Sequence, residues 1–248
     1  MRVVIAAVLA VLSLTAAAAD RSYAVLALVG DQLVISTYQP GTGSRLDRNV
    51  RQVVPLGNDA FDRSLVRWIG DEIDRLEPGA SVELLAAGNH KVFEEANASL
   101  DGGGVPSLVP TLRSQVGSVK ASHWLVVTKQ RAEVRAETTD GHTLGSGSAE
   151  GLGFYIDRSR DMRLAKTGEG ALGFLAPFAY LRLTLIEAAT GKIVSEATAL
   201  RSQAMVRPDA THPWDALSAE EKVRILEQLA REGVEDTLPK VLAPPPTR

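Results

Sequence analysis

The chain has 248 residues, of which 45% are hydrophobic, and it carries 27 basic and 30 acidic side chains with no cysteine. This is the composition of a globular protein with enough apolar residues for a sizeable core. It excludes disulfides, thiolate chemistry and cysteine metal sites. The scattered, slightly acidic charge offers no basic surface to nucleic acids.

The amino terminus has the three-part layout of a secretory signal peptide. Met1 and Arg2 form a short positive segment, an apolar run covers residues 3–14, and small residues occupy positions 17 and 19. The run is about a dozen residues long, whereas a helix that spans a bilayer needs roughly 20. We therefore predict a signal peptide over residues 1–19, export to the periplasm, and no transmembrane segment in the mature chain.

The mature chain begins with strand patterns. Residues 23–29 and 33–38 are apolar or β-branched runs on either side of Gly30-Asp31, which predicts a β-hairpin. A third strand is expected over residues 49–56.

Helical periodicity follows. Apolar residues recur every three or four positions from Phe61 to Leu76, which predicts an amphipathic helix capped by Asn58 or Asp59. The next expected elements, in chain order, are a strand at 81–86, helices at 92–100 and 108–119, and strands at 123–128, 131–138 and 152–156.

The carboxyl-terminal half contains a long segment without a helix or strand pattern. We predict a polar loop over residues 157–173, with four basic and three acidic side chains. Strands at 180–187 and 193–200 follow, joined by a turn. Ser218 and Glu221 form a capping box for a last helix, which is expected to bury Val223, Leu226, Ala230 and Val234.

These elements predict an α/β (α+β) fold: a single domain over residues 20–243 with a disordered tail at 244–248. Helices would pack on a mixed or mainly antiparallel sheet with hairpins, because purely parallel sheets need long crossovers throughout.

Two stretches carry a resemblance to envelope proteins. With the preceding elements, "SHWLVVTK" and the "LRLTLIEAATGKIV" hairpin resemble the TolB amino-terminal domain and the curli-secretion lipoprotein family, although the lipidated cysteine of the curli proteins is missing. "GSRLDRN" and "GLGFYIDR" with "GFLAPFAYLRLTL" are similar to an uncharacterised exported proteobacterial family. These resemblances imply an envelope location and no catalytic residue.

One set of residues resembles the GDSL (SGNH) hydrolases. Gly30-Asp31-Gln32, Gly57-Asn58-Asp59 and Asp209 with His212 follow that family's order. The family's serine nucleophile would occupy the position of Gln32, an amide that cannot serve. Asp209 and His212 remain catalytic candidates for a degenerate or unrecognised hydrolase. The alternative is a capped loop before Trp214.

Two further patterns are weaker. Gly88-Asn89-His90 resembles one block of the calcineurin-like metallophosphoesterases, but the chain has four histidines and no Asp-x-His motif. We predict no metal site and no cofactor. The glycines over residues 145–153 precede a strand instead of a helix, which favours bulges or close backbone approach over a phosphate loop.

The remaining hypothesis is binding. Five aromatic residues flank the predicted loop: Phe154, Tyr155, Phe174, Phe178 and Tyr180. They form either a contact rim for an envelope protein or part of the core. We predict a non-catalytic exported accessory or interaction protein of the cell envelope; the alternative is the SGNH-like hydrolase.

Overall fold

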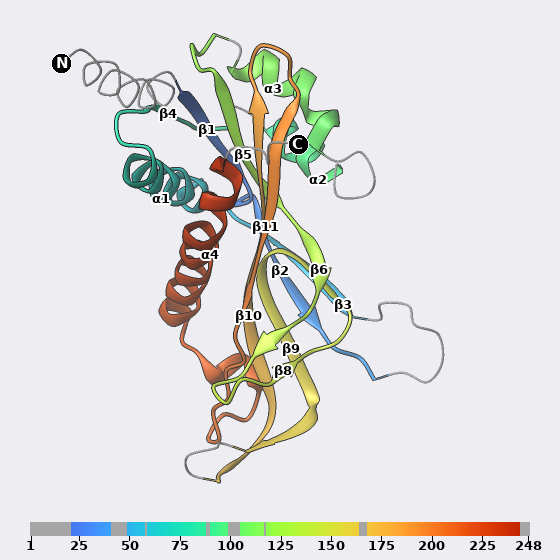
Figure 1. Ribbon diagram of the computed structural model, residues 1–248. Helices are drawn as coiled ribbons and strands as arrows, with labels where there is room; N and C mark the ends of the chain where they lie inside the picture. The colour runs from blue at the N-terminus through green and yellow to red at the C-terminus, as the bar shows by residue number, and fades with distance from the viewer. Residues whose placement is uncertain are drawn as a thin grey trace, which may run out of the picture.

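The computed structural model describes residues 21–40, 49–57, 59–87, 90–98, 105–116, 118–163 and 168–243. Within these ranges the chain forms a single mixed α/β domain with a nine-stranded sheet and four α-helices packed on it, as predicted (Figure 1). The predicted signal peptide and the tail at 244–248 lie outside the described residues.

The elements follow one another in this order: β1 (Ser22–Leu28), β2 (Gln32–Thr37), β3 (Val50–Pro55), α1 (Ala60–Leu76), β4 (Ser81–Leu85), α2 (His90–Ala98), η2 (Val105–Leu108), α3 (Val109–Val116), β5 (His123–Lys129), β6 (Arg131–Glu133), β7 (Ala136–Glu137), β8 (Thr143–Leu144), β9 (Ser148–Arg163), β10 (Gly170–Glu187), β11 (Ile193–Ser202), η3 (Pro213–Ala216) and α4 (Ala219–Leu242).

Strand β10 is the central element of the sheet. Along one edge it pairs first with β9 and then with β5, and along the other edge it pairs with β11. The sheet order β3-β2-β9-β10-β5-β1-β4 therefore consists of two half-sheets that share β10. Most residues of β10 are buried, as expected for a strand that is covered on both faces.

The predicted hairpin between the first two strands is wrong. Strand β1 pairs in parallel with β4 and β5, whereas β2 pairs with β3 and β9. The chain passes from one half-sheet to the other at Gly30-Asp31. The apolar run of β1 belongs to a strand buried on both faces, and such a strand does not need its neighbour in sequence as a partner.

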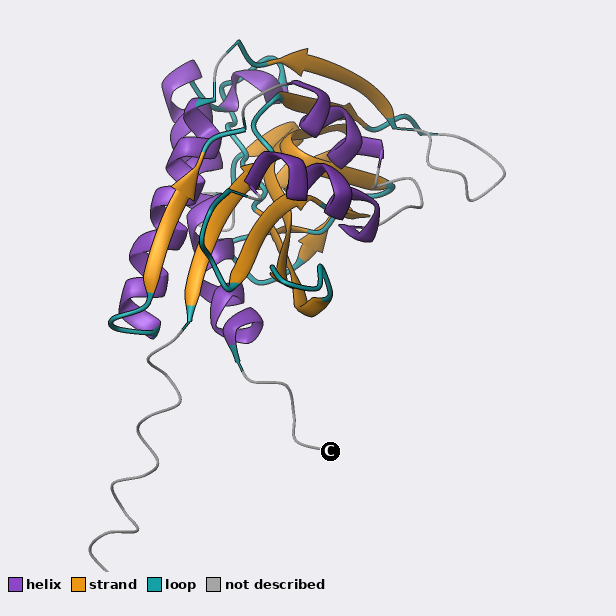
Figure 2. Cartoon of the chain, turned by 90° about the horizontal axis from the view of Figure 1, so that it is seen from above, coloured by secondary structure: helices purple, strands orange, loops and turns teal. Residues whose placement is uncertain are grey.

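Helices cover both faces of the half-sheet that contains β1 (Figures 1 and 2). Helices α1 and α4 pack on one face, where Leu65, Ile69 and Ile73 of α1 lie in the largest core cluster. Helices α2 and α3 contribute to a second cluster, with Val92 and Leu112. None of the described helices combines the length and the apolar character needed to cross a membrane.

The predicted capping box of α4 is confirmed. Ser218 accepts from the N–H of Glu221, and the Glu221 carboxylate accepts from the N–H of Ser218. Val223 is 56% exposed, contrary to prediction, whereas Leu226, Ala230 and Val234 are buried. At α1, Asp59 is the N-cap residue without a capping bond.

The predicted loop at 157–173 is wrong for most of its described residues, and residues 164–167 lie outside the described ranges. Residues Asp157–Arg163 continue β9, and β10 starts at Gly170, opposite Arg163. These parts of the two strands are mostly exposed, so their polar side chains resemble a loop in the sequence. Likewise, the strand predicted at 131–138 is divided into β6 and β7, which pair with β9 and β8.

Close backbone approach at the glycines of β9 is confirmed. A Cβ atom on Gly153 would lie 1.8 Å from the carbonyl oxygen of Val34, in the neighbouring strand. Gly151 has φ +67° and lies under the aliphatic part of Lys129. Only glycine allows β2 and Lys129 to come this close to β9.

We therefore expect Gly153→Ala to lower the free energy of unfolding by about 3 kcal/mol or more, because the added carbon must push two strands apart. Urea denaturation checks this. The control is Gly57→Ala, where the Cβ atom meets nothing within 4 Å and the change should stay within about 0.5 kcal/mol. Equal stability of the two variants would contradict the interpretation.

Candidate functional site

Charged side chains meet where the two half-sheets join. The ammonium of Lys129, at the end of β5, lies 2.5 Å from Oδ1 of Asp31, and both side chains are buried. The contact is ionic, since its angles do not satisfy hydrogen-bond geometry. Asn97 of α2 donates to Oδ2 of Asp31 at 3.1 Å. The parallel course of β1 and β5 brings Asp31 and Lys129 to the same edge.

Asp62 holds the bend between β1 and β2 from the first turn of α1. Its Oδ1 accepts from the N–H groups of Val29 and Gly30, each at 3.0 Å. A Cβ atom on Gly30 would lie 3.0 Å from Phe61, so glycine permits this approach. Burial raises the pKa of Asp62 to about 6, although the backbone donors act in the opposite direction.

We call Asp31, Asp62, Asn97 and Lys129 the junction cluster. Its members are two carboxylates, an amide and an ammonium, each in contact with another segment of the fold. This arrangement can fix the two half-sheets relative to each other, and we interpret it as structural.

Asp62, Asn97 and Lys129 were not among the residues that the sequence pattern marked as candidates for a site. A signal existed, because Asp31 and Lys129 each follow a long apolar run, and charges at the ends of buried parallel strands gather at one edge. The predicted hairpin made β1 antiparallel to its neighbour, so this rule for parallel strands was not applied to Asp31 and Lys129.

A pocket of about 350 Å³ is formed by residues of β8, β9 and the segment after β11. These elements lie at the opposite end of the sheet from β4 (Figure 1). Apolar side chains that share one cluster line it, from β8, β9 and the segment after β11: Leu144, Met162, Ala204 and Val206. We call this the Met162 pocket. Met205 also borders it, while its side chain packs against the separate cluster around Phe154.

Polar residues lie at the rim of the Met162 pocket. The Thr138 hydroxyl donates to Asp140, which lowers the pKa of that carboxyl group. His142 Nε2 lies 3.9 Å from Asp140, and the backbone N–H of His142 donates to Thr138 Oγ1 at 2.9 Å. The hydroxyl therefore holds the turn instead of facing the imidazole, as a nucleophile would.

The five predicted binding aromatics are buried. None is more than 2% exposed. Four of them belong to the cluster that includes Met162, and the ring of Phe154 packs edge-on against Trp214 at 5.3 Å. The predicted aromatic rim is therefore absent from the described surface, because the long strands β9 and β10 bury these rings on their two faces.

The two predicted catalytic residues have separate contacts. Asp209 is exposed and lies 3.9 Å from Arg207, whereas Nδ1 of His212 accepts from the N–H of Trp214 at 3.0 Å and caps η3. Among the described residues, no hydrogen bond joins Asp209 to His212. Gln32 begins β2. This is the geometry of the capped loop that formed the alternative interpretation.

The described residues of the metallophosphoesterase-like motif do not form a site either. Gly88 and Asn89 lie outside the described residues, and His90 begins α2. Within the described part of the chain, no three His, Asp or Glu side chains are grouped as metal ligands would be.

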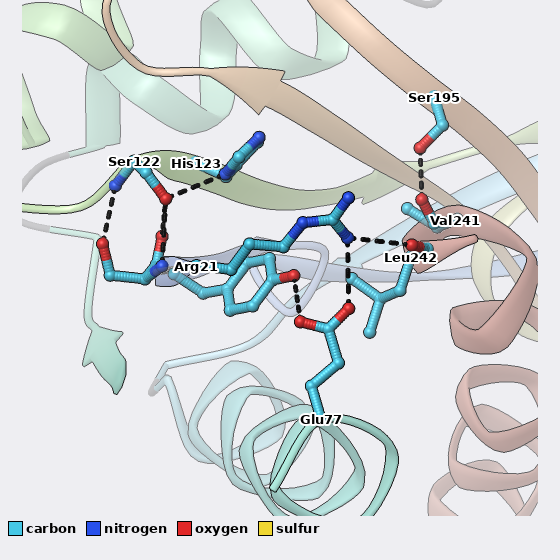
Figure 3. A network of polar contacts seen from close by, with 9 residues as sticks. Arg21, Glu77, Ser122, His123, Ser195, Val241 and Leu242 are labelled. Atoms are coloured by element: carbon cyan, nitrogen blue, oxygen red, sulfur yellow. Dashed lines mark hydrogen bonds and ion pairs between the residues drawn. The ribbon is translucent and has the colours of Figure 1, made fainter. Parts of the chain in front are cut away.

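A polar network closes the end of the sheet where β1 begins (Figure 3). Arg21 donates to Glu77 Oε1 and to the carbonyl oxygen of Leu242, both at 3.1 Å, and Tyr23 donates to Glu77 Oε2 at 2.6 Å. These bonds tie β1 to the carboxyl-terminal ends of α1 and α4. Burial raises the pKa of Tyr23 to about 12.

The same network contains a serine–histidine contact. Ser122 Oγ lies 2.9 Å from Nδ1 of His123, but it also accepts from the N–H of Ser22 at 2.9 Å and lies within donating distance of its carbonyl oxygen. Burial and the charge of Arg21 lower the pKa of His123. Among the described residues no carboxylate is hydrogen-bonded to this imidazole, so the contact is not a triad.

No family model and no curated protein matches the chain. Similar solved structures include a neuraminyllactose-binding hemagglutinin homolog from Helicobacter pylori, at 13% identity and a TM-score of 0.42, over 90% of this chain and 87% of that chain. A DUF330 protein from Xanthomonas campestris has 12% identity and a TM-score of 0.36, over 88% and 84% of the two chains. The LpoB C-terminal domain from Salmonella enterica has 13% identity and a TM-score of 0.25, over 79% and 93%.

Similarities this distant assign neither a family nor a function to the chain. They do not confirm the resemblance to TolB and the curli-secretion family.

The raised pKa of Asp62 predicts a pH dependence of stability. The folded chain binds the proton more tightly than the unfolded chain, whose Asp titrates near 3.8. The raised pKa of Asp62 therefore stabilises the folded chain fully below about pH 4. This stabilisation, which is up to about 3 kcal/mol, is lost as the pH rises to about 6. We expect Asp62→Asn to gain stability relative to the parent over this range, as measured by urea denaturation at several pH values. Parallel curves would contradict this.

Removing the cation of the junction cluster should be costly. Lys129→Met keeps the aliphatic volume but leaves Asp31 buried without its partner, which we expect to cost about 3–5 kcal/mol. The additional change Asp31→Asn should recover part of this loss. A control is Lys222→Met, which removes a cation 4.3 Å from the Trp214 ring and should cost about 1 kcal/mol at most. Additive effects of the two junction changes would refute the coupling.

Proposed function

We propose that this chain is a non-catalytic accessory protein of the cell envelope, exported to the periplasm, which binds an envelope protein through the exposed end of the β9–β10 hairpin. The signal-peptide layout of residues 1–19 supports the location. The structural roles of His212, Ser122 and Thr138, described above, support a non-catalytic role.

The observation that carries the proposal is the exposed apolar side chain on this hairpin. Leu172 is 55% exposed, among the highest values for large apolar side chains in the described chain. Most of the β9 residues around its pairing partner Asp161 are exposed and charged. An apolar anchor within a polar rim is the usual anatomy of a protein interface.

The hairpin is also held firmly enough to present this side chain. Gly173 has φ +80°, and a Cβ atom there would lie 2.1 Å from the carbonyl oxygen of Asp157. Asp157 in turn accepts from the N–H and the hydroxyl of Ser159, and Arg160 lies 3.5 Å from it. A preorganised contact loses less entropy on binding than a loose one.

We expect Leu172→Glu to remove partner binding while the protein stays folded, because the side chain is already in water. The measurement is in-cell crosslinking and affinity capture of the tagged protein, with the thermal unfolding midpoint as the check on folding. Val223→Glu on α4, where the parent residue is 56% exposed, is the matched control. One envelope protein captured by the parent and the control, but not by Leu172→Glu, supports the proposal.

Equal capture by all three proteins would refute the contact at Leu172. The hydrolase alternative has its own test with esterase and phosphatase substrates. Turnover by the purified protein that His212→Ala abolishes would overturn the non-catalytic proposal.

A further inference from the structure

The Met162 pocket combines apolar walls with a cation whose side chain has no partner among the described residues. Arg163 lines the pocket and is exposed, and its side chain has no ion pair or hydrogen bond with any described residue. The other arginines of this hairpin segment include Arg160, which lies 3.5 Å from Asp157. The guanidinium of Arg163 is therefore available to an anion at the pocket.

The walls fit an apolar chain. Leu144, Met162 and Val206 are half-buried, which means that the pocket keeps apolar surface in contact with water. Covering that surface with a ligand is favourable in proportion to its area. The unbranched thioether of Met162 adapts to ligands of different shape. A volume of about 350 Å³ is near the lower end of the range for small-molecule sites.

Asp140 is the acidic side chain among the described residues that line the pocket, and it is not paired with the cation. It accepts from Thr138 and lies 3.9 Å from His142, and no ion pair joins it to Arg163 in the described chain. An anion near Arg163 would meet an unpaired guanidinium, which binds carboxylates and phosphates through two parallel hydrogen bonds.

We propose that the Met162 pocket binds a small amphiphile, with its apolar chain against Leu144, Met162 and Val206 and its anionic head group on Arg163. The head group is a carboxylate or a phosphate, and the chain is short or is the end of a longer one. This site lies on the same hairpin end as the protein contact proposed at Leu172 but uses other side chains, since Leu172 pairs with Asp161 and not with Met162 or Arg163.

The first measurement is the affinity of the purified protein for straight-chain carboxylates of six to twelve carbons, by calorimetry below their micellar concentrations. Each added methylene should tighten binding about fourfold until the pocket is full, after which affinity should level off. Decyl phosphate and decanol distinguish the head groups, and decanol should bind about tenfold more weakly than decanoate. No binding of decanoate at millimolar concentration would overturn the proposal.

The variants place the ligand in the pocket. Arg163→Gln should weaken decanoate binding about tenfold and leave decanol binding unchanged. Arg160→Gln is the matched control on the same strand and should have no effect. Equal affinities for the parent and Arg163→Gln would refute the assigned head-group contact.

Methionine-methyl NMR gives a readout that does not depend on a variant folding. The chain has three methionines, at positions 1, 162 and 205. Decanoate should shift the methyl signal of Met162 more than that of Met205, whose side chain packs against the Phe154 cluster. Binding by calorimetry without a shift at Met162 would place the ligand elsewhere and overturn the assignment.

Discussion

The fold depends on the buried contact between Lys129 and Asp31. Strand β10 runs through both half-sheets, but β5 and β9 meet end to end along it, and β1 gives way to β2 at the same level. Along this edge β10 changes its partner there, and the backbone hydrogen bonds that cross the junction, from Gln130 to Tyr180 and from Gly151 to Gln130, are supplemented by the buried ion pair. Burying two charges costs several kcal/mol per ion. We infer that the cluster contributes a defined relative position of the half-sheets more than net stability.

This constraint explains why glycines and charges occur together. Lys129 must cross β9 to reach Asp31, and Gly151 leaves room for its aliphatic part. Gly30 lets Asp62 approach the bend closely enough to accept two backbone hydrogen bonds, and Gly153 lets β2 lie directly against β9. Each glycine leaves room for a contact at the junction between the half-sheets. The glycines and the buried charges are therefore both needed for the same close packing.

The sequence could predict what local chemistry determines. The capping box at Ser218, the apolar stripe of α1 and the hairpin of β10 and β11 depend on residues near one another in the chain, and all three are confirmed. The pairing of β1 depends on β5, about a hundred residues away, and its apolar run fits either topology. The exposed end of the β9–β10 hairpin resembles a loop because most of its β9 residues are polar and exposed. The Met162 pocket is formed by three segments that are distant in the sequence, so no local motif could predict it.

The two ends of the sheet differ in how their charges are used. At the end where β1 begins, Arg21, Tyr23 and Glu77 bind one another and the last turn of α4. At the junction, Lys129 is enclosed with Asp31. At the far end, Arg163 has no partner within the described chain, and Leu172 is exposed. Side chains without an internal partner are the ones free to bind another molecule. The far end is therefore where both proposed contacts lie, while the closed end and the junction supply the rigid frame that holds them.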